Sequence, residues 1–308
     1  MKDSVILKKK ADKTSELSGI VPPLVTPFKE DGSIDYTLFR NEVRQMVGLG
    51  IAGISVGGSN GEGATLSEEE LVKLIQISSD EVNGKVKLVC GIIVDSAYQA
   101  IRKALAVKQL GVDYLMITPI HYLDNSGEMG LYEYYKEIYK KAGIPIIVYN
   151  VVPWYVATPS NLIRMHKDGF IAAVKQSGGD IHALGELLTL AKSDMPIMTA
   201  IDDMMYPSFM LGSVGSICAM NTLIPRSSLR LLDYVKNKDY DKALELHERI
   251  LPMCKKILTP NMPSRIKFAM NKTGWRVGVA RKPILPLSEQ ETAELNVLSK
   301  EVSRLEGV

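Results

Sequence analysis

The sequence predicts an α/β protein, a (β/α)8 barrel with a C-terminal helical extension. Two observations lead to this prediction: short apolar segments without polar alternation recur along the chain, and an amphipathic segment follows each of them. Apolar segments of this kind are typical of strands buried on both faces, as in a parallel sheet. Eight such units with no evident dinucleotide-binding motif favour a closed barrel over the alternative, a doubly wound open sheet.

The eight expected strands are four to seven residues long, and most are rich in valine and isoleucine. They are Ile20–Leu24, Gly53–Val56, Val86–Cys90, Tyr114–Ile117, Ile144–Tyr149, Ile171–Val174, Pro196–Ile201 and Ser213–Ala219. The expected helices are Tyr36–Gly48, Ser67–Val82, Ser96–Gly111, Glu128–Gly143, Pro159–Asp168, Ile181–Ser193, Asp203–Leu211 and Pro225–Val235. Ser67 and Glu70 have the spacing of a capping box, and Pro159 suits the first position of a helix.

Three regions are expected along the chain. Residues 1–17 are charged at several positions and predict a mobile N-terminal extension. Residues 18–236 hold the barrel. Residues 237–308 lack further strands and predict a helical extension, with helices over Asp239–Cys254, Asn261–Lys272 and Ser288–Leu305.

The composition is that of a globular protein. Of the 308 residues, 46% are hydrophobic and 23% are charged, and the net charge is +2. Interspersed acids and bases argue against nucleic acid or a membrane surface as the main partner. No segment is long and apolar enough for a signal peptide or a membrane span, so a cytoplasmic protein is expected.

Cysteine and histidine usage predicts neither disulfides nor a metal site. Cys90, Cys218 and Cys254 are far apart and form no CxxC pair, which suits free buried thiols in a reducing compartment. The four histidines show no metal-ligand spacing such as HExxH. We therefore expect no metal and no cofactor.

Lys175 is the main candidate for chemistry, because it ends an expected strand and catalytic groups of a barrel lie at the carboxyl ends of its strands. A lysine removed from water is more readily neutral, and a neutral amine can attack a ketone and form an imine. The alternative is a lysine whose ammonium simply reaches solvent. Tyr149 weakens that alternative, because it ends the preceding strand, about 4.8 Å away in a parallel sheet. Its phenol can shuttle protons there, unless it only covers the core.

The glycine-rich segment Gly57–Gly63 directly follows the second expected strand. Its glycines let the backbone approach a ligand, and Ser59 and Asn60 add short polar side chains. The segment is a candidate for binding a carboxylate. A phosphate is the alternative anion, but no lysine of a nucleotide-binding P-loop follows. A tight turn without any ligand is the other interpretation.

Together these segments resemble the dihydrodipicolinate synthase / N-acetylneuraminate lyase family. The resemblance is carried by Gly58–Glu62, Tyr149-Asn150 and Val174-Lys175, in the same order and at similar spacing. It extends over roughly residues 18 to 300. Further matching segments are Pro22–Phe28, Thr118-Pro119, Asp202-Asp203, Gly212–Ile217 and Arg281–Leu287.

The resemblance implies a cofactor-free class I aldolase or lyase on a barrel, usually a homotetramer, with a dimer also open. Lys175 would form the imine with pyruvate or a longer 2-oxo acid, and Tyr149 would relay a proton. The loop that begins with Gly58 would hold the carboxylate through Ser59 and Asn60, and the Ser59 hydroxyl would join the relay. The main-chain carbonyl of Ile217 corresponds to one that contacts the substrate in the family.

The sequence departs from the family pattern in three places, of which the first concerns the second substrate, an aldehyde. The segment after Tyr149 lacks the arginine usual in the lysine-pathway enzymes and carries Trp154 and Tyr155, which favour a monocarboxylate or aromatic aldehyde unless they pack against a neighbouring subunit. His121 or Tyr122 would replace the second tyrosine of the relay, or His121 has no role. Ser59-Asn60 replaces the common Thr-Thr pair and resembles the hydroxy-oxoglutarate and 2-keto-3-deoxy-sugar-acid aldolases.

Four functions follow from this pattern. The main hypothesis is an aldolase that joins or cleaves pyruvate and an aldehyde. One alternative is 4-hydroxy-tetrahydrodipicolinate synthase of lysine biosynthesis. Another is a dehydratase or deaminase that uses the same imine. A non-catalytic homologue that binds a 2-oxo acid is the alternative from a different class, although a binding protein would not need Lys175 and Tyr149 together.

Overall fold

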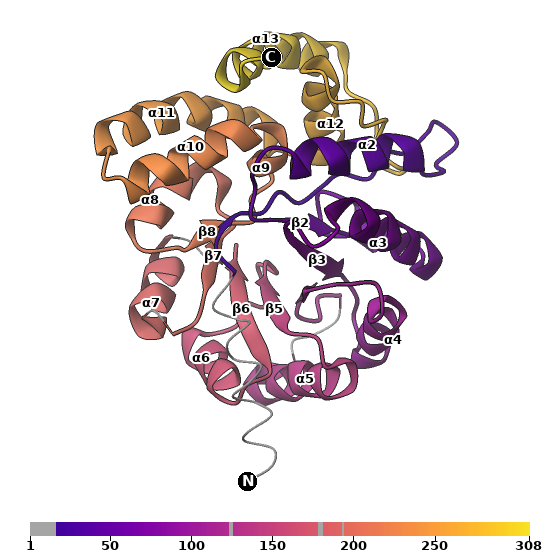
Figure 1. The fold of residues 1–308 in the computed structure, drawn as a ribbon, viewed down its shortest axis with the longest axis vertical. Helices are drawn as coiled ribbons and strands as arrows, with labels where there is room; N and C mark the ends of the chain where they lie inside the picture. The colour runs from indigo at the N-terminus through magenta and orange to yellow at the C-terminus, as the bar shows by residue number, and fades with distance from the viewer. Residues whose placement is uncertain (1–16, 123–125, 178–180, 193) are drawn as a thin grey trace.

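The computed structural model describes residues 17–122, 126–177, 181–192 and 194–308. Eight parallel strands form one sheet in the order β1-β8-β7-β6-β5-β4-β3-β2. A parallel bridge between Pro23 and Ser55 joins the two ends of the sheet, so the strands close into a barrel inside a ring of helices (Figure 1). The strands are β1 (Gly19–Ile20), β2 (Gly53–Val56), β3 (Lys87–Ile92), β4 (Tyr114–Ile117), β5 (Ile146–Asn150), β6 (Ile171–Gln176), β7 (Ile197–Thr199) and β8 (Gly215–Ser216).

The helices of the ring follow the strands along the chain. They are α2 (Tyr36–Val47), α3 (Glu68–Val82), α4 (Ala97–Val107), α5 (Gly127–Ala142), α6 (Pro159–Lys167), α7 (Ile181–Ala191), α8 (Met205–Met210) and α10 (Pro225–Lys236). Short turns η1 (Gly63–Thr65) and η2 (Asp202–Met204) follow β2 and β7. The predicted capping box is present, because Ser67 Oγ accepts from the Glu70 N–H and Glu70 Oε2 accepts from the Ser67 N–H. Pro159 occupies the first turn of α6, after Thr158 as N-cap.

The predicted barrel is confirmed, and its eight strands lie where they were expected. Both β2 and β4 have the predicted bounds, whereas β1 and β8 are shorter than predicted. Gly215 of β8 lies so close to β1 that a Cβ on it would come within 2.0 Å of the Gly19 carbonyl oxygen. Steric fit therefore limits this pair of strands to glycine at the contact, a requirement that apolar content does not reveal.

The C-terminal part is helical, as predicted. It contains α11 (Tyr240–Ile257), α12 (Met262–Lys272) and α13 (Glu289–Glu306), and the short helix α9 (Met220–Leu223) precedes α10. In Figure 1 the helices α12 and α13 lie on one side of the barrel, next to α2 and α9. A division at residue 236 stays a prediction. The predicted mobile extension lies outside the described residues up to residue 16, and Leu17 is buried.

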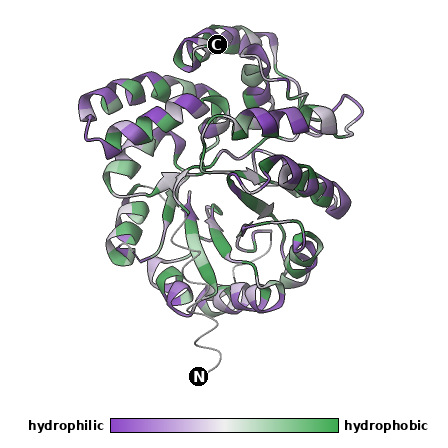
Figure 2. Ribbon diagram, viewed as in Figure 1, coloured by the Kyte–Doolittle hydropathy of each residue, from purple (hydrophilic) through white to green (hydrophobic). Residues whose placement is uncertain are grey.

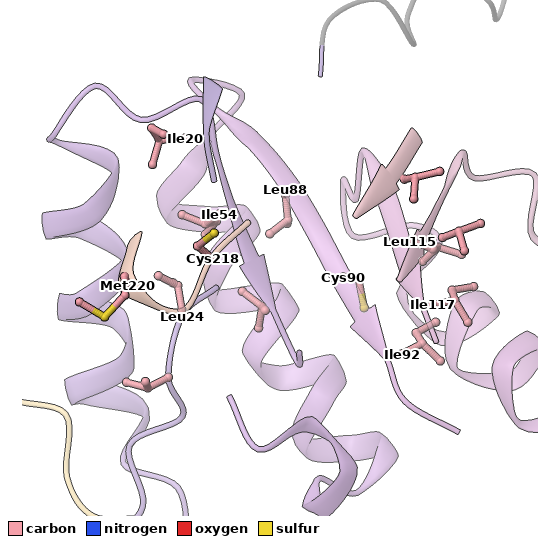
Figure 3. Packing of buried hydrophobic residues seen from close by; sticks show 14 of the residues in the cluster. Ile20, Leu24, Ile54, Leu88, Cys90, Ile92, Leu115, Ile117, Cys218 and Met220 are labelled. Carbon is pink, nitrogen blue, oxygen red and sulfur yellow. The ribbon is translucent and has the colours of Figure 1, made fainter. Parts of the chain in front are cut away.

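The barrel has two apolar layers. The larger lies between strands and helices. It includes Ile54, Cys90 and Ile117, which Figure 3 shows among the other buried side chains of this layer. The smaller fills the barrel interior and includes Met116, Ile147 and Met198. Hydrophilic and hydrophobic segments alternate along the outer helices, whereas β6 is mainly hydrophobic (Figure 2). The two layers explain why the strands lack polar alternation, since both of their faces are buried.

All three cysteines are free and buried, as predicted. Within the described ranges, no helix combines the length and the apolar character that a membrane crossing requires.

Glu42 of α2 is a carboxyl group enclosed by the apolar layer. Its side chain is buried, Oε1 accepts from the Val25 N–H at 3.2 Å, and Oε2 has no partner among the residues described. Burial raises the pKa of Glu42 from its ordinary 4.5 to about 8, against the opposing effects of the Val25 N–H and the charge of Lys267. The folded protein therefore holds a proton here that the unfolded chain releases at neutral pH.

We expect Glu42→Gln to remove a pH dependence of stability. Because the folded-state pKa is the higher one, the wild type loses unfolding free energy as pH rises from about 4.5 to about 8, by at most about 1.4 kcal/mol per pKa unit. The neutral variant lacks this loss, so its unfolding free energy relative to that of the wild type increases between pH 5 and pH 8. Urea denaturation of both proteins at the two pH values measures it. An equal difference at both values would contradict the assignment.

Candidate active site

The register between β5 and β6 brings Tyr149 and Lys175 side by side. Ile146 pairs with Ile171, but Ile147 pairs with Ala173, so β6 carries one extra residue at this point. After this shift Tyr149 and Lys175 are direct partners across the two strands. Tyr149 belongs to the layer inside the barrel, which places both groups at the carboxyl ends of their strands and within the interior.

The amine of Lys175 is buried but makes no hydrogen bond to any described residue. The side chain is only 5% exposed, and Nζ lies 3.8 Å from the centre of the Tyr149 ring. The face of an aromatic ring attracts a cation but is not a hydrogen-bond donor. When the amine is neutral, no described group therefore occupies the lone pair of its nitrogen. An amine held in this way is available to a carbonyl substrate that enters the barrel.

Lys267 is a second buried lysine, and it is fully engaged. Its Nζ donates to Glu62 Oε1, to the Thr26 carbonyl and to the Val279 carbonyl, at 2.5, 2.6 and 2.7 Å. These three bonds use all three N–H groups of an ammonium. Burial lowers the pKa of Lys267, although the Glu62 carboxylate opposes this effect. Geometry therefore favours Lys175 over Lys267 as the nucleophile.

The Ser59 hydroxyl lies within hydrogen-bond distance of the Tyr149 hydroxyl, at 2.9 Å. Ser59 is exposed, so the pair connects the buried phenol to the open end of the barrel. Among the described side chains, only Ser59 is hydrogen-bonded to Tyr149. Lys175, Tyr149 and Ser59 therefore form a continuous row from amine to phenol to hydroxyl, across β6, β5 and the loop after β2.

The loop after β2 is a tight backbone turn with free N–H groups. The Glu62 N–H donates to the Ser59 carbonyl and the Gly63 N–H to the Gly58 carbonyl, both at 3.0 Å. A Cβ on Gly63 would lie 1.8 Å from the Gly57 carbonyl oxygen, so the turn requires glycine there. The N–H groups of Ser59 and Asn60 donate to no described acceptor. Two adjacent free N–H groups of this kind can bind a carboxylate.

Asn60 has a buried side chain with a structural contact. Its Nδ2 donates to the Pro23 carbonyl at 3.1 Å and lies within hydrogen-bond range of Thr222 Oγ1 and the Ala219 carbonyl. The Nδ2 group of Asn60 thus ties the loop to the segments after β1 and β8, while no described donor reaches its Oδ1. In the same region the Ile217 N–H donates to the Thr199 carbonyl, while no described donor reaches the Ile217 carbonyl.

His121 and Tyr122 lie on the loop after β4, away from the Tyr149 hydroxyl. Asp95 Oδ1 accepts from the backbone N–H groups of both residues, and His121 Nδ1 lies 3.1 Å from the same oxygen. Tyr122 is 81% exposed. Within the part of the chain described, neither side chain is hydrogen-bonded to Tyr149 or to Ser59.

Trp154 and Tyr155 take different positions on the loop after β5. Trp154 is 66% exposed, and its indole N–H donates to the His121 carbonyl, which joins this loop to the one after β4. Tyr155 is buried, and its hydroxyl donates to the Gly127 carbonyl at the start of α5. Asn150 supports the loop, because it exchanges hydrogen bonds with the backbone of Ala157. Trp154, rather than Tyr155, therefore offers surface to a ligand.

Asp202 is a charged group of the site to which the sequence analysis gave no role. It follows β7, and its Oδ1 accepts from the Met220 N–H at 2.7 Å. Burial raises the pKa of Asp202 to about 6, although the Met220 N–H and the positive charge of Lys175 act in the opposite direction. Its place just after β7, at the same end of the barrel as Lys175, is the sequence signal that could have identified it.

A closed eight-stranded barrel with a buried lysine beside a tyrosine at the carboxyl ends of its strands is the arrangement expected of a class I lyase, an enzyme of the aldolase type. The family model of the dihydrodipicolinate synthetase family matches residues 16–302. The chain belongs to this family.

Curated relatives agree with this assignment. A 4-hydroxy-tetrahydrodipicolinate synthase of Bartonella bacilliformis is 32% identical over 279 residues, which cover 89% of this chain and 94% of the relative. An enzyme of the same name from Methanothrix thermoacetophila is 29% identical over 293 residues, with 94% and 98% covered.

Solved structures share the fold. A protein of Pseudomonas aeruginosa described as a dihydrodipicolinate synthetase superposes with a TM-score of 0.88 at 26% identity, over 93% of this chain and 99% of that one. A sialic acid aldolase of Ruminococcus gnavus has the same TM-score at 18% identity, over 95% and 99% of the two chains, and shows the fold alone.

We expect Tyr149→Phe to slow turnover by about 10²–10⁴-fold, the usual contribution of a positioned acid or base. The ring stays beside Lys175, and only the hydroxyl that contacts Ser59 is lost. Steady-state kinetics with thermal unfolding as a check on folding measures the effect. Tyr135→Phe is the matched control, since it removes a buried hydroxyl that donates to the Ile117 carbonyl. An unchanged rate in Tyr149→Phe would remove the phenol from the mechanism.

Proposed function

We propose that Lys175 forms an imine with a 2-oxo acid such as pyruvate, and that the enzyme makes or breaks a carbon–carbon bond to an aldehyde. The observation that supports this proposal is the buried Lys175 amine, which is free of described hydrogen bonds and stacked on Tyr149. The neutral amine attacks the ketone carbon, and one proton moves from the nitrogen to the ketone oxygen to give a carbinolamine. A second proton, from Tyr149, turns its hydroxyl into water, which leaves as the protonated imine forms. That cation then accepts the electron pair of the C–C or C–H bond that breaks at the adjacent carbon.

The polar groups around Lys175 suit the remaining steps. The free N–H groups of Ser59 and Asn60 bind the carboxylate of the 2-oxo acid. Tyr149 transfers the proton to the departing oxygen, and Ser59 passes protons between the phenol and the open end of the barrel. In the aldol direction the same phenol protonates the new alkoxide. Desolvation inside the barrel strengthens each of these contacts.

The aldehyde is proposed to lack a carboxylate of its own. The segment 151–157 contains no arginine or lysine, and its exposed side chain nearest to the loop after β4 is the indole of Trp154. An apolar or aromatic aldehyde fits this surface. A second candidate is 4-hydroxy-tetrahydrodipicolinate synthesis, which the names of the curated relatives favour. That reaction needs a cation for its acidic aldehyde, and this segment supplies none.

We expect borohydride to trap a pyruvate adduct on Lys175. Reduction of the imine fixes the ketone carbon to the amine, and peptide mass mapping then locates the modified lysine. Lys175→Ala, with the fold checked by circular dichroism, is the control and should give no adduct and no turnover. An adduct only with longer 2-oxo acids would instead favour a dehydratase or deaminase. No adduct with any 2-oxo acid would overturn the proposal.

We expect aldehydes without a carboxylate to be the better partners. Pyruvate consumption would be measured with a series that includes glyceraldehyde, benzaldehyde and aspartate semialdehyde. Trp154→Arg adds a cation at the open end of the barrel and should raise kcat/KM for aspartate semialdehyde relative to benzaldehyde, by about 10-fold or more. If the wild type already prefers aspartate semialdehyde, the lysine-pathway function replaces the one proposed here.

A further inference from the structure

Lys267 connects the C-terminal helices to the loop that carries Ser59. It lies on α12, is 1% exposed, and reaches the loop from outside the barrel. Its three acceptors belong to three segments: Glu62 of the loop, Thr26 after β1, and Val279 after α12. A single ammonium therefore joins the active-site loop to two other parts of the chain.

Glu62 is held from two sides. Oε1 accepts from Lys267, and Oε2 accepts from the Arg281 N–H at 2.8 Å. The residue has a φ of 54°, in the left-handed region that non-glycine residues seldom adopt. Such a conformation persists only where surrounding contacts enforce it, and both carboxylate oxygens supply such contacts. The carboxylate of Glu62 thus fixes the backbone of the turn three residues after Ser59.

A second connection reaches the same turn from Lys267. The Thr26 carbonyl accepts from Lys267, and Thr26 Oγ1 donates to the Gly61 carbonyl at 2.6 Å. Gly61 and Glu62 are consecutive in the turn. The ammonium of Lys267 therefore anchors the turn directly at Glu62 and, through Thr26, at Gly61. Arg281 adds an outer connection, because its guanidinium donates to the Thr65 and Gly32 carbonyls and pairs with Glu70.

We propose that Glu62 and Lys267 are positioning residues, which hold Ser59 at hydrogen-bond distance from Tyr149. The inference rests on the proposed function, since it assigns work to the row from Lys175 to Tyr149 to Ser59. In this role the C-terminal helices contribute to proton transfer without contacting the substrate. The loop itself has a free tip, because Ser59 is exposed and its N–H is unbonded within the described residues.

Stability alone does not account for this ion pair. Both side chains are only 1% exposed, and the cost of removing two charges from water offsets most of their attraction. A well-packed apolar pair would serve stability as well. What an apolar pair would not supply is a directed hydrogen bond from α12 to the Glu62 side chain of the loop, and this bond is the one to which the positioning role is assigned.

The test is a double-mutant cycle between Glu62→Gln and Ser59→Ala in the full-length protein. A glutamine offers one acceptor where the carboxylate offers two, so either the Lys267 or the Arg281 contact is lost. The measured quantity is the rate constant at which the trapped pyruvate adduct accumulates on Lys175. We expect Glu62→Gln to lower it by about 10–100-fold in the wild type, and by less than about 3-fold in Ser59→Ala.

A control variant, a replacement variant and the wild type make the result of the cycle interpretable. Glu70→Gln alters the outer part of the same ionic network and should leave the rate within about 2-fold of the wild type. Equal rate losses from Glu62→Gln in both backgrounds, or no loss at all, would overturn the positioning role. If Glu62→Gln does not fold, Lys267→Arg replaces it in the cycle, because a planar guanidinium keeps the charge but not the three donor directions. Failure of the proposed function is separate, because the wild type would then trap no adduct.

Discussion

The pairing of Tyr149 with Lys175 across β5 and β6 is the constraint on which the site depends. Because side chains alternate between the two faces of a strand, a register change of one residue would turn Lys175 toward the helices and away from the interior. The extra residue of β6 at Ala172 sets that register. The amine is thereby enclosed by the barrel and lies over the Tyr149 ring. The Tyr149 hydroxyl in turn lies within hydrogen-bond distance of the Ser59 hydroxyl.

Two buried lysines show how environment separates roles within one chain. Lys267 donates to three acceptors, whereas Lys175 contacts an aromatic face and keeps its amine free of described hydrogen bonds. The sequence does not distinguish the two, because each is a single lysine next to apolar residues. Their difference lies in which backbone carbonyls the fold brings near, and this depends on contacts between distant segments.

The sequence was enough for the barrel and for the three residues in the row, because strand ends converge whatever fills the remaining chain. It was not enough for the role of each side chain. The substrate-binding roles expected of Asn60 and Tyr155 stay predictions, and the pattern did not indicate that Asn60 Nδ2 and the Tyr155 hydroxyl donate to backbone carbonyls of other segments. Asp202 was passed over, because its raised pKa comes from burial that no local pattern reveals.

The open end of the barrel is supported by two separate sets of contacts. The loop after β2 is anchored to the C-terminal helices through a buried ion pair, while the loops after β4 and β5 are held to each other by the Trp154 indole and the His121 carbonyl. The two sets share no residue. Under the function proposed above, recognition of the aldehyde and reaction at the lysine have separate supports, so one reactant could be exchanged for another during evolution while the chemistry at the lysine stays intact.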